Sequence, residues 1–325
     1  MRTIRPCLAA SLGTILATTL SLGATAAIPA AERQALTNLY TATHGGGWTS
    51  RNNWCSGACG SSDTPAFNGV GTECTWYGVG CDESGAHVIE LGLAGNNLGG
   101  TLPAPTALTQ LRYLAVTQNH LGGSLPSLAG LSQLRSAYFD ANAFGGTMPA
   151  FAGLGNLEEF SAADNQLSGS LPSLGSLTHL VRLNLARNAL SGGFPSLAGL
   201  GALRELDLSD NRLSGALGAF SPASRALVLA LGGNAFSGSL PSLGSNAELY
   251  RLDVGGNRLS GAIPAAPAML YAAPVLSAST LCPNGFTLTP SANDAGWNAA
   301  TGYTPWWATP FANNLCDDLF FSGFQ

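Results

Sequence analysis

Leucine and asparagine recur at a fixed spacing through the middle of the chain. Each repeat carries a step of period two, as at Leu206 and Leu208, just before an asparagine. This is the spacing of a half-buried strand. The asparagines recur at one constant interval without insertion or deletion, at Asn96, Asn119, Asn142, Asn165, Asn188, Asn211, Asn234 and Asn257. Eight strands about 4.8 Å apart predict a parallel sheet roughly 35–40 Å long.

The rest of each repeat predicts how a single coil closes. We expect the asparagine to end the strand, because its amide can satisfy backbone groups in a turn and asparagine tolerates unusual backbone dihedrals. Leucines three positions apart before the strand, such as Leu200 and Leu203, predict a short helical or 3₁₀ segment on the opposite side. Each coil leaves an apolar interior that only a neighbouring coil can cover. The pattern therefore predicts an α/β solenoid of eight 23-residue repeats.

The repeat resembles a known family. Its form is Leu-x-x-Leu-x-x-Leu-x-Leu-x-x-Asn-x-Leu-x-Gly-x-Leu-Pro, which is similar to the leucine-rich repeat, and the ending Ser168-Gly169-Ser170-Leu171-Pro172 resembles its plant-specific subclass. That subclass forms receptor-kinase ectodomains and polygalacturonase-inhibiting proteins in plants, and it also occurs in secreted bacterial proteins. The resemblance implies a right-handed superhelix with its parallel sheet on the concave face. The usual plant repeat is slightly longer than the repeat of this chain, so curvature cannot be carried over from those relatives.

The segments that flank the repeats are interpreted as caps, because each end of a stack exposes apolar surface and unpaired strand edges. A helix is predicted from Glu32 to Thr43, and a loop from Ser56 to Thr72. The sequence from Cys74 to Cys81 resembles the Cys-x-Trp-x-Gly-Val-x-Cys of plant-type N-terminal caps. All six tryptophans lie outside the repeats. Among them Trp306 and Trp307 are expected to pack in a C-terminal cap, with sugar stacking as the alternative.

The first residues predict export. Two arginines, an apolar stretch and small residues near Ala26 are typical of a secretory signal; a retained membrane anchor is the alternative. The expected organisation is residues 1–27 signal peptide, 28–86 N-terminal cap, 87–267 repeats, and 268–325 C-terminal cap and tail. The aromatic tail at 317–325 either folds onto the cap or serves as a sorting or docking signal.

Six cysteines remain once Cys7 leaves with the signal. An even number in an exported chain predicts disulfides. Four of these cysteines precede the repeats and two follow them, which favours the pairs Cys55–Cys59, Cys74–Cys81 and Cys282–Cys316. A zinc site is the competing interpretation for the first four.

Charge excludes one class of partner. Without the two arginines of the signal, 11 basic residues face 18 acidic ones, a net charge of −7, and the chain has no lysine. Nucleic-acid binding needs a positive surface, so it is not expected. Neither is a transmembrane segment after the signal, because the best apolar stretch is broken by Pro274.

Residues between the inward leucines of a strand face the concave side. The candidate binding residues there are Tyr113, His120, Tyr138, Asp140, Glu159, Arg182, Glu205, Asp207, Arg251 and Asp253. Tyrosine and arginine are common hot spots of protein interfaces. The alternative is that these charges only pair across adjacent strands. The seventh repeat, with Val228, Ala230 and Gly232, is bare.

No catalytic, metal or cofactor site is expected. The four histidines form no Ser-His-Asp or Cys-His set, and no Gly-x-Ser-x-Gly elbow occurs. Asp207 and Asp253 are separated by two repeats, about 10 Å along the sheet. The leading hypothesis is a secreted or cell-surface recognition protein, with the periplasm also possible, that binds a protein or a polysaccharide. The alternatives are an inhibitor of a secreted hydrolase such as polygalacturonase, and a structural or adhesive surface protein.

Overall fold

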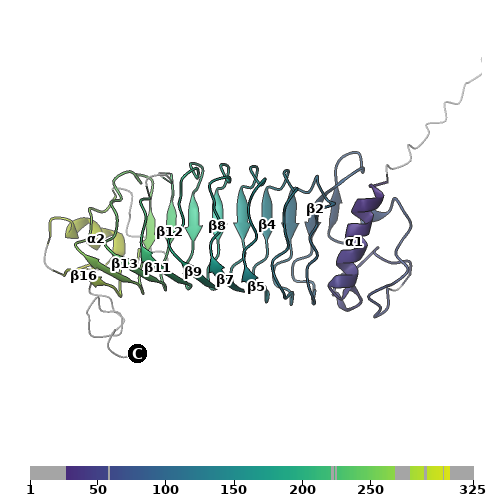
Figure 1. The fold of residues 1–325 in the computed structure, drawn as a ribbon, viewed down its shortest axis with the longest axis horizontal. Helices are drawn as coiled ribbons and strands as arrows, with labels where there is room; N and C mark the ends of the chain where they lie inside the picture. The colour runs from purple at the N-terminus through teal and green to yellow at the C-terminus, as the bar shows by residue number, and fades with distance from the viewer. Residues whose placement is uncertain are drawn as a thin grey trace, which may run out of the picture.

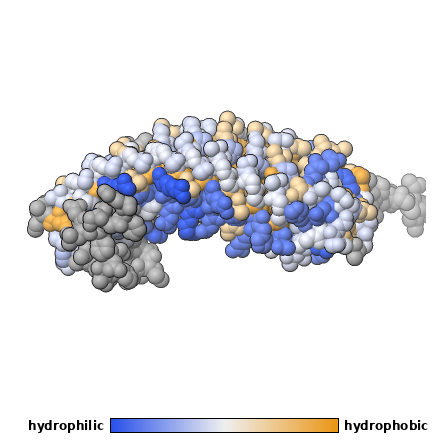
Figure 2. All heavy atoms as spheres, turned by 60° about the horizontal axis from the view of Figure 1, so that its bottom comes forward, coloured by the Kyte–Doolittle hydropathy of each residue, from blue (hydrophilic) through white to orange (hydrophobic). Residues whose placement is uncertain are grey.

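The computed structural model describes residues 27–57, 59–220, 223, 225–267, 279–288, 291–302 and 304–307. Their coils stack into a single solenoid (Figure 1), which is arched, with hydrophilic residues gathered along its hollow side (Figure 2). The predicted signal peptide apart from residue 27, the tail at 317–325 and Cys316 lie outside the described residues. No helix among the described residues has the length and apolar character needed to cross a bilayer.

A nine-stranded sheet lines the concave face. Its order is β1-β2-β3-β4-β6-β8-β10-β12-β14, antiparallel between β1 and β2 and parallel beyond them. One strand comes from each successive coil, so the predicted parallel sheet is confirmed. The strands are β1 (Val79–Cys81), β2 (Val88–Gly92), β3 (Tyr113–Ala115), β4 (Ser136–Tyr138), β6 (Glu159–Ser161), β8 (Arg182–Asn184), β10 (Glu205–Asp207), β12 (Val228–Ala230) and β14 (Arg251–Asp253).

A second parallel sheet, which the leucine pattern did not predict, follows the ladder asparagines. Its order is β16-β15-β13-β11-β9-β7-β5. It is built from the short Ser-Gly stretches, whose small residues carry little of the alternation that identifies a strand. The strands are β5 (Gly145–Thr147), β7 (Gln166–Ser170), β9 (Ala189–Gly192), β11 (Arg212–Ala216), β13 (Ala235–Gly238), β15 (Arg258–Gly261) and β16 (Gly285–Phe286).

The convex side corrects one prediction. The segment of leucines spaced three apart forms successive turns and not a helical or 3₁₀ segment. The amide of Leu203 donates to the carbonyl of Leu200 at 3.1 Å, and Leu111 donates to Leu108 at 2.9 Å. Each leucine closes one turn and sends its side chain into the core, so the spacing of three arises without a continuous helix.

The asparagines, which are buried or half-buried, form a ladder that joins successive coils. The Nδ2 of Asn188 donates to Ala162 O at 2.9 Å and to Leu185 O and Ala186 O at 3.2 Å, while its Oδ1 accepts from the amide of Leu167 at 2.9 Å. One side chain thus satisfies backbone groups of its own coil and of the preceding one. The same arrangement recurs at Asn142, Asn165, Asn211, Asn234 and Asn257.

The positive φ angle occurs at the residue before each ladder asparagine and not at the asparagine itself. None of the eight ladder asparagines has a positive φ; the residue before each of them does, including Asp164 and Arg187 at φ 54°. The expectation that the asparagine itself takes this conformation is therefore wrong.

The ladder also extends one step further than the regular spacing shows. Asn284 accepts from Leu259 N at 2.8 Å and donates to Val254 O at 2.8 Å, although its interval from Asn257 is longer than the repeat.

The N-terminal cap seals the first coil with aromatic rings. Helix α1 (Ala30–Ala42) and the 3₁₀ turns η1 (Gly45–Gly47) and η2 (Glu73–Thr75) surround the buried side chains of Tyr40, Trp48, Trp54 and Trp76. Disulfides join Cys55 to Cys59 and Cys74 to Cys81, with Cα–Cα distances of 5.2 and 5.5 Å. The predicted Cys282–Cys316 pair is not placed, because Cys316 is outside the described residues.

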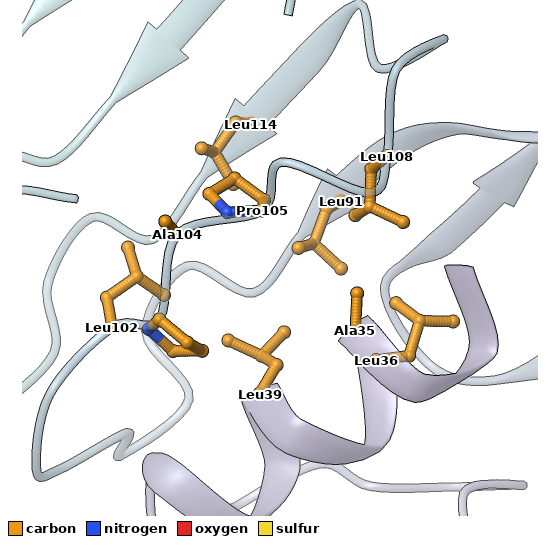
Figure 3. A pocket seen from close by; sticks show the side chains of 10 residues that line it. Ala35, Leu36, Leu39, Leu91, Leu102, Ala104, Pro105, Leu108 and Leu114 are labelled. Atoms are coloured by element: carbon orange, nitrogen blue, oxygen red, sulfur yellow. The ribbon is translucent and has the colours of Figure 1, made fainter. Parts of the chain in front are cut away.

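Leucines join this cap to the repeats. Leu36 and Leu39 of α1 face Leu91 and Leu108 of the first coils (Figure 3). The space left between them is about 20 Å³, room for about one water. This junction is a packed seam and not a ligand site.

The C-terminal cap is built on α2 (Asp294–Thr301). The indole of Trp297 donates to Pro264 O at 2.7 Å, and the indole of Trp306 donates to Asp294 Oδ1 at 3.1 Å. Trp306 is 1% exposed and packs edge-on against Trp307, whose side chain is half-buried. The tryptophan pair thus packs within the cap, and its burial leaves no open face on Trp306 for a sugar.

One hydrogen-bonded contact in the N-terminal cap was not predicted from the sequence, because its partners lie far apart along the chain. The Glu32 carboxylate is buried; it contacts His87 Nδ1 at 2.7 Å and accepts from the amide of Val88 at 2.8 Å. The hydrogen bond from His87 to Glu32 raises the pKa of the imidazole, with the charge of Glu32 acting in the same direction.

The ladder predicts a stability effect for Asn188→Ala. Removing this side chain takes away the acceptor of the Leu167 amide and one of the donors to the carbonyls of Leu185 and Ala162, which keep their bonds to Asn211 and Asn165, so we expect a loss of about 2 kcal/mol in the free energy of unfolding. Chemical denaturation followed by circular dichroism measures it. The control is Asn156→Ala on the convex side, where one exposed hydrogen bond to Ser132 O is lost and the change should stay below about 0.5 kcal/mol. Equal losses in both variants would contradict the role of the ladder.

The His87–Glu32 contact predicts a pH dependence. Because the pKa of His87 is raised in the folded protein, its stabilising effect is fully present below the unfolded pKa near 6.5 and is lost as pH rises through the higher folded value. The variant His87→Gln should therefore lose this decline of unfolding free energy above pH 6.5. Urea titrations across pH 5.5–8.5 measure it, and an unchanged pH profile in the variant would refute the assignment.

Candidate functional site

Two columns of side chains project from the nine-stranded sheet onto the concave face. On each strand the middle residue, such as Leu183 of β8, is buried in the core, so its two neighbours point outward. The parallel register aligns these neighbours from coil to coil. The first column is Glu90, Tyr113, Ser136, Glu159, Arg182, Glu205, Val228 and Arg251, and the second is Gly92, Ala115, Tyr138, Ser161, Asn184, Asp207, Ala230 and Asp253.

Eight of the ten candidate residues lie in these columns. The other two lie elsewhere. Asp140 follows β4 by two positions, where it accepts hydrogen bonds from Ser161 and from the amide of Ala163 at 2.8 Å. His120 comes after Asn119, at the repeat position where Gln166 begins β7, so it lies on the flank of the second sheet and away from the other nine. Sequence spacing missed this because the second sheet was not foreseen.

Aromatic and charged groups meet near the middle of the face. The rings of Tyr113 and Tyr138 lie 5.8 Å apart on adjacent coils. The Tyr138 hydroxyl donates to Glu159, which also pairs with Arg182. Burial, together with the Glu159 carboxylate, raises the pKa of Tyr138 to about 12, so the phenol is neutral at physiological pH.

A shallow hollow opens beside this network. It is lined by Tyr138, Glu159, Arg182, Asn184 and Glu205, among others, and has a volume of about 220 Å³. Pockets for complete small-molecule ligands usually measure about 300–1,000 Å³. The hollow therefore suits a side chain presented by a larger partner better than a free small molecule.

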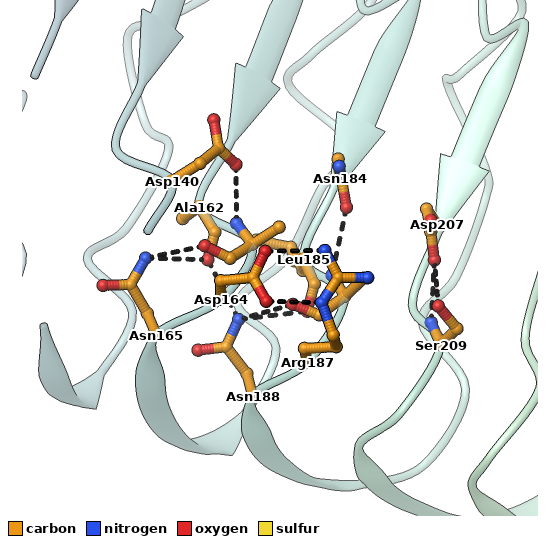
Figure 4. Close-up of polar contacts among 12 residues, drawn as sticks. Asp140, Ala162, Asp164, Asn165, Asn184, Leu185, Arg187, Asn188, Asp207 and Ser209 are labelled. Atoms are coloured by element: carbon orange, nitrogen blue, oxygen red, sulfur yellow. Dashed lines mark hydrogen bonds and ion pairs between the residues drawn. The ribbon is translucent and has the colours of Figure 1, made fainter. Parts of the chain in front are cut away.

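Charges in the central coils pair across neighbouring strands. Arg187 donates from two nitrogens to both carboxylate oxygens of Asp164 (Figure 4). Arg135 pairs with Glu158 at 2.6 Å. The Arg187 guanidinium holds the pKa of Asp164 below its usual value. For Glu159 and Arg182, on β6 and β8, the alternative that concave charges pair across adjacent strands holds. The other two pairs lie outside the concave columns.

Charges toward the C-terminal end are not paired in this way. Within the described part of the chain, Glu205, Asp207, Asp210 and Asp253 form no ion pair. Asp207 Oδ1 accepts from the hydroxyl and amide of Ser209 at 2.6 and 3.0 Å (Figure 4). Burial raises the pKa of Asp253, and the charge of Asp207 adds to the effect. Strand β12 lies between β10, which carries Asp207, and β14, which carries Asp253. It presents only Val228 and Ala230 to the concave face.

Catalytic chemistry gains no support from this arrangement. Asp207 and Asp253 lie on β10 and β14 with β12 between them, on an open sheet. No group of three or more histidine, cysteine, aspartate or glutamate residues with the arrangement of a metal site occurs among the described residues. In the described part of the chain, this face is an open sheet with the shallow hollow beside Tyr138.

Comparison with known proteins identifies the repeat. The leucine-rich-repeat family model matches residues 202–221, and no curated protein sequence matches the chain. A plant peptide hormone receptor, RGFR1 in complex with RGF2, is 31% identical over 51% of this chain and 28% of its own, with a TM-score of 0.49. The match thus spans less than a third of that receptor.

Two further solved structures match larger shares of their own length. The ectodomain of the receptor kinase SOBIR1 from Arabidopsis thaliana is 25% identical over 58% of this chain and 97% of its own, with a TM-score of 0.43. A plant ice-binding protein is 22% identical over 82% of this chain and 91% of its own, with a TM-score of 0.53. The ice-binding protein shares the fold over most of both chains.

The pairing of central charges predicts a small energetic coupling. In a double-mutant cycle with Asp164→Asn and Arg187→Gln, we expect at most about 1 kcal/mol of coupling at pH 7, because both side chains are largely exposed. Since the folded pKa of Asp164 is lowered, the coupling should disappear as pH falls through that value. Urea denaturation at pH 7 and pH 3 tests this; a coupling of several kcal/mol would show that the pair is a main support of the sheet.

Proposed function

We propose that this chain, which the leucine-rich-repeat family model matches at residues 202–221, is an exported recognition protein whose concave sheet binds a protein partner. The observation that carries the proposal is the tyrosine pair beside the hollow at Arg182 and Glu205. Tyrosine and arginine contribute much of the energy of protein interfaces, because each combines a large contact area with a polar group. An open face of eight parallel strands suits an extended partner.

The geometry also favours recognition over stability as the role of these groups. Tyr113 and Tyr138 stay partly exposed, whereas the aromatic side chains that support the fold, such as Phe139 and Phe160, are 1% exposed. Two disulfides in the cap support export, because such bonds persist in oxidising compartments. These observations support a protein that acts by binding, outside the cell or on its surface.

The test combines four substitutions on the face: Tyr113→Ser, Tyr138→Ser, Arg182→Gln and Arg251→Gln. Immobilised native and variant proteins are used to capture partners from envelope and host extracts, which mass spectrometry then identifies and quantifies. We expect at least a tenfold loss of the specific partner, because hot-spot residues each contribute more than about 1 kcal/mol.

The matched control changes the exposed convex residues Thr109, Gln133 and His179 to alanine. It should capture the partner as the native protein does, and circular dichroism establishes that both variants fold. If the concave variant retains every partner, the proposed site is wrong.

A further inference from the structure

The concave face is divided into two electrostatically different parts. In the central coils Glu159 and Asp164 pair with Arg182 and Arg187, and the tyrosine pair provides an apolar surface. Asp140 in this part accepts hydrogen bonds from Ser161 and Ala163 instead. In the last three repeats, four carboxylates share the face with one guanidinium, that of Arg251. The four are Glu205, Asp207, Asp210 and Asp253.

We propose that one extended protein segment lies across this face, with an aromatic or apolar side chain against Tyr113 and Tyr138 and an arginine or lysine side chain over Gly232 and Gly233. This inference rests on the proposed function and specifies the chemistry of its partner. The negative charge of the last repeats indicates where the basic side chain of the segment binds, and the tyrosine pair indicates where its aromatic or apolar side chain binds.

The acidic end has a defined geometry. Neighbouring carboxylates reach over the two glycines of the seventh repeat from both sides. A Cβ atom on Gly232 would lie 2.8 Å from Asp253 Oδ1, and one on Gly233 would collide with Asp210 Oδ1. The glycines therefore leave room for carboxylates from the sixth and eighth repeats to converge. Asp207 of β10 is turned toward Ser209 (Figure 4).

Arg251 acts on Asp253 and lowers its pKa against the larger effect of burial, but among the described residues it forms no ion pair with any of these carboxylates. Arg187 is engaged by Asp164, and the charges of Asp207 and Asp210 act on it from a distance. Arg212 and Arg258 begin strands of the second sheet, away from the concave columns. An incoming guanidinium or ammonium group would add the missing positive charge, and arginine can bind two carboxylate oxygens at once.

The distance between the two ends predicts the spacing in the partner. Four strand-to-strand steps separate β4 from β12, in the order β4-β6-β8-β10-β12. At about 4.8 Å for each step this is roughly 19 Å. An extended chain advances about 3.3 Å per residue, so the aromatic and the basic residue of the partner should be about six positions apart.

Synthetic peptides test the proposal on the full-length protein. The probe carries tryptophan and arginine six positions apart in a serine-glycine sequence, prepared in both chain directions. One comparison peptide has glutamate in place of arginine, and another places tryptophan and arginine two positions apart. Titration at low ionic strength, followed by the NMR shifts of the protein amides, gives the affinities. At least one direction of the six-position probe should bind ten times more tightly than either comparison peptide.

The matched protein variants locate the site. Asp207→Asn with Asp210→Asn keeps the shape and the hydrogen bonds to Ser209, and it should weaken the probe about tenfold. The control, Glu83→Gln with Glu248→Gln, makes the same change in net charge at exposed positions off the concave columns and should bind the probe as the native protein does. Circular dichroism melting checks that both variants fold.

Several results would overturn the proposal: no binding of the six-position probe to the native protein, equal binding of the glutamate peptide, or unchanged affinity in the Asp207/Asp210 variant. Calcium that binds with the same dependence on these aspartates and displaces the probe would make them a metal site instead. If the capture experiment still locates a partner on the concave face, only the partner chemistry inferred here fails, and concave recognition stands.

Discussion

The hydrogen bonding of the asparagine side-chain amides is the interaction on which the other features of this protein depend. Each coil turns back on itself, and that turn leaves backbone amides and carbonyls inside an apolar stack. From Asn119 on, each ladder asparagine satisfies groups in two successive coils, as Asn188 does with Leu167 and Ala162 of the preceding coil and Leu185 of its own. Asn96 instead joins the first coil to Ser50 of the cap. Such backbone groups are costly when left unpaired in a dry interior. The ladder therefore ties coil to coil, and the register of the concave sheet follows from it.

The register of the concave sheet brings residues from different coils together into one surface. Because every coil repeats the same path, side chains one repeat apart align in columns about one strand spacing from each other. Tyr138, Glu159 and Arg182 become neighbours although they come from three successive coils. Where the seventh repeat replaces side chains by glycines, the same alignment brings the carboxylates of the repeats on either side together. The recognition proposed for this face thus depends on the residues that depart from the repeat, while the repeated residues build the solenoid that carries them.

Sequence reasoning succeeded where one local rule acts on every coil. The ladder asparagines, the inward leucines, the parallel strands and helix α1 all follow from short patterns. It failed where geometry depends on neighbours. The Ser-Gly strands of the second sheet form because an adjacent coil supplies their hydrogen bonds, and His120 was placed on the wrong flank as a result. The left-handed residue precedes the asparagine because the asparagine side chain must point inward. Asn284 was hidden by a longer interval, and the contact of Glu32 with His87 joins elements that no local pattern connects.

Amide hydrogen exchange of the native protein tests the central claim most directly. The amides of Leu121, Leu167 and Leu213 donate to the side-chain oxygens of Asn142, Asn188 and Asn234. If the ladder holds the coils together, these amides exchange only through opening of the whole stack, as slowly as the amides inside the nine-stranded sheet. Exchange at the rate of exposed turns on the convex side would show that the coils open one by one without the ladder, and would contradict the account.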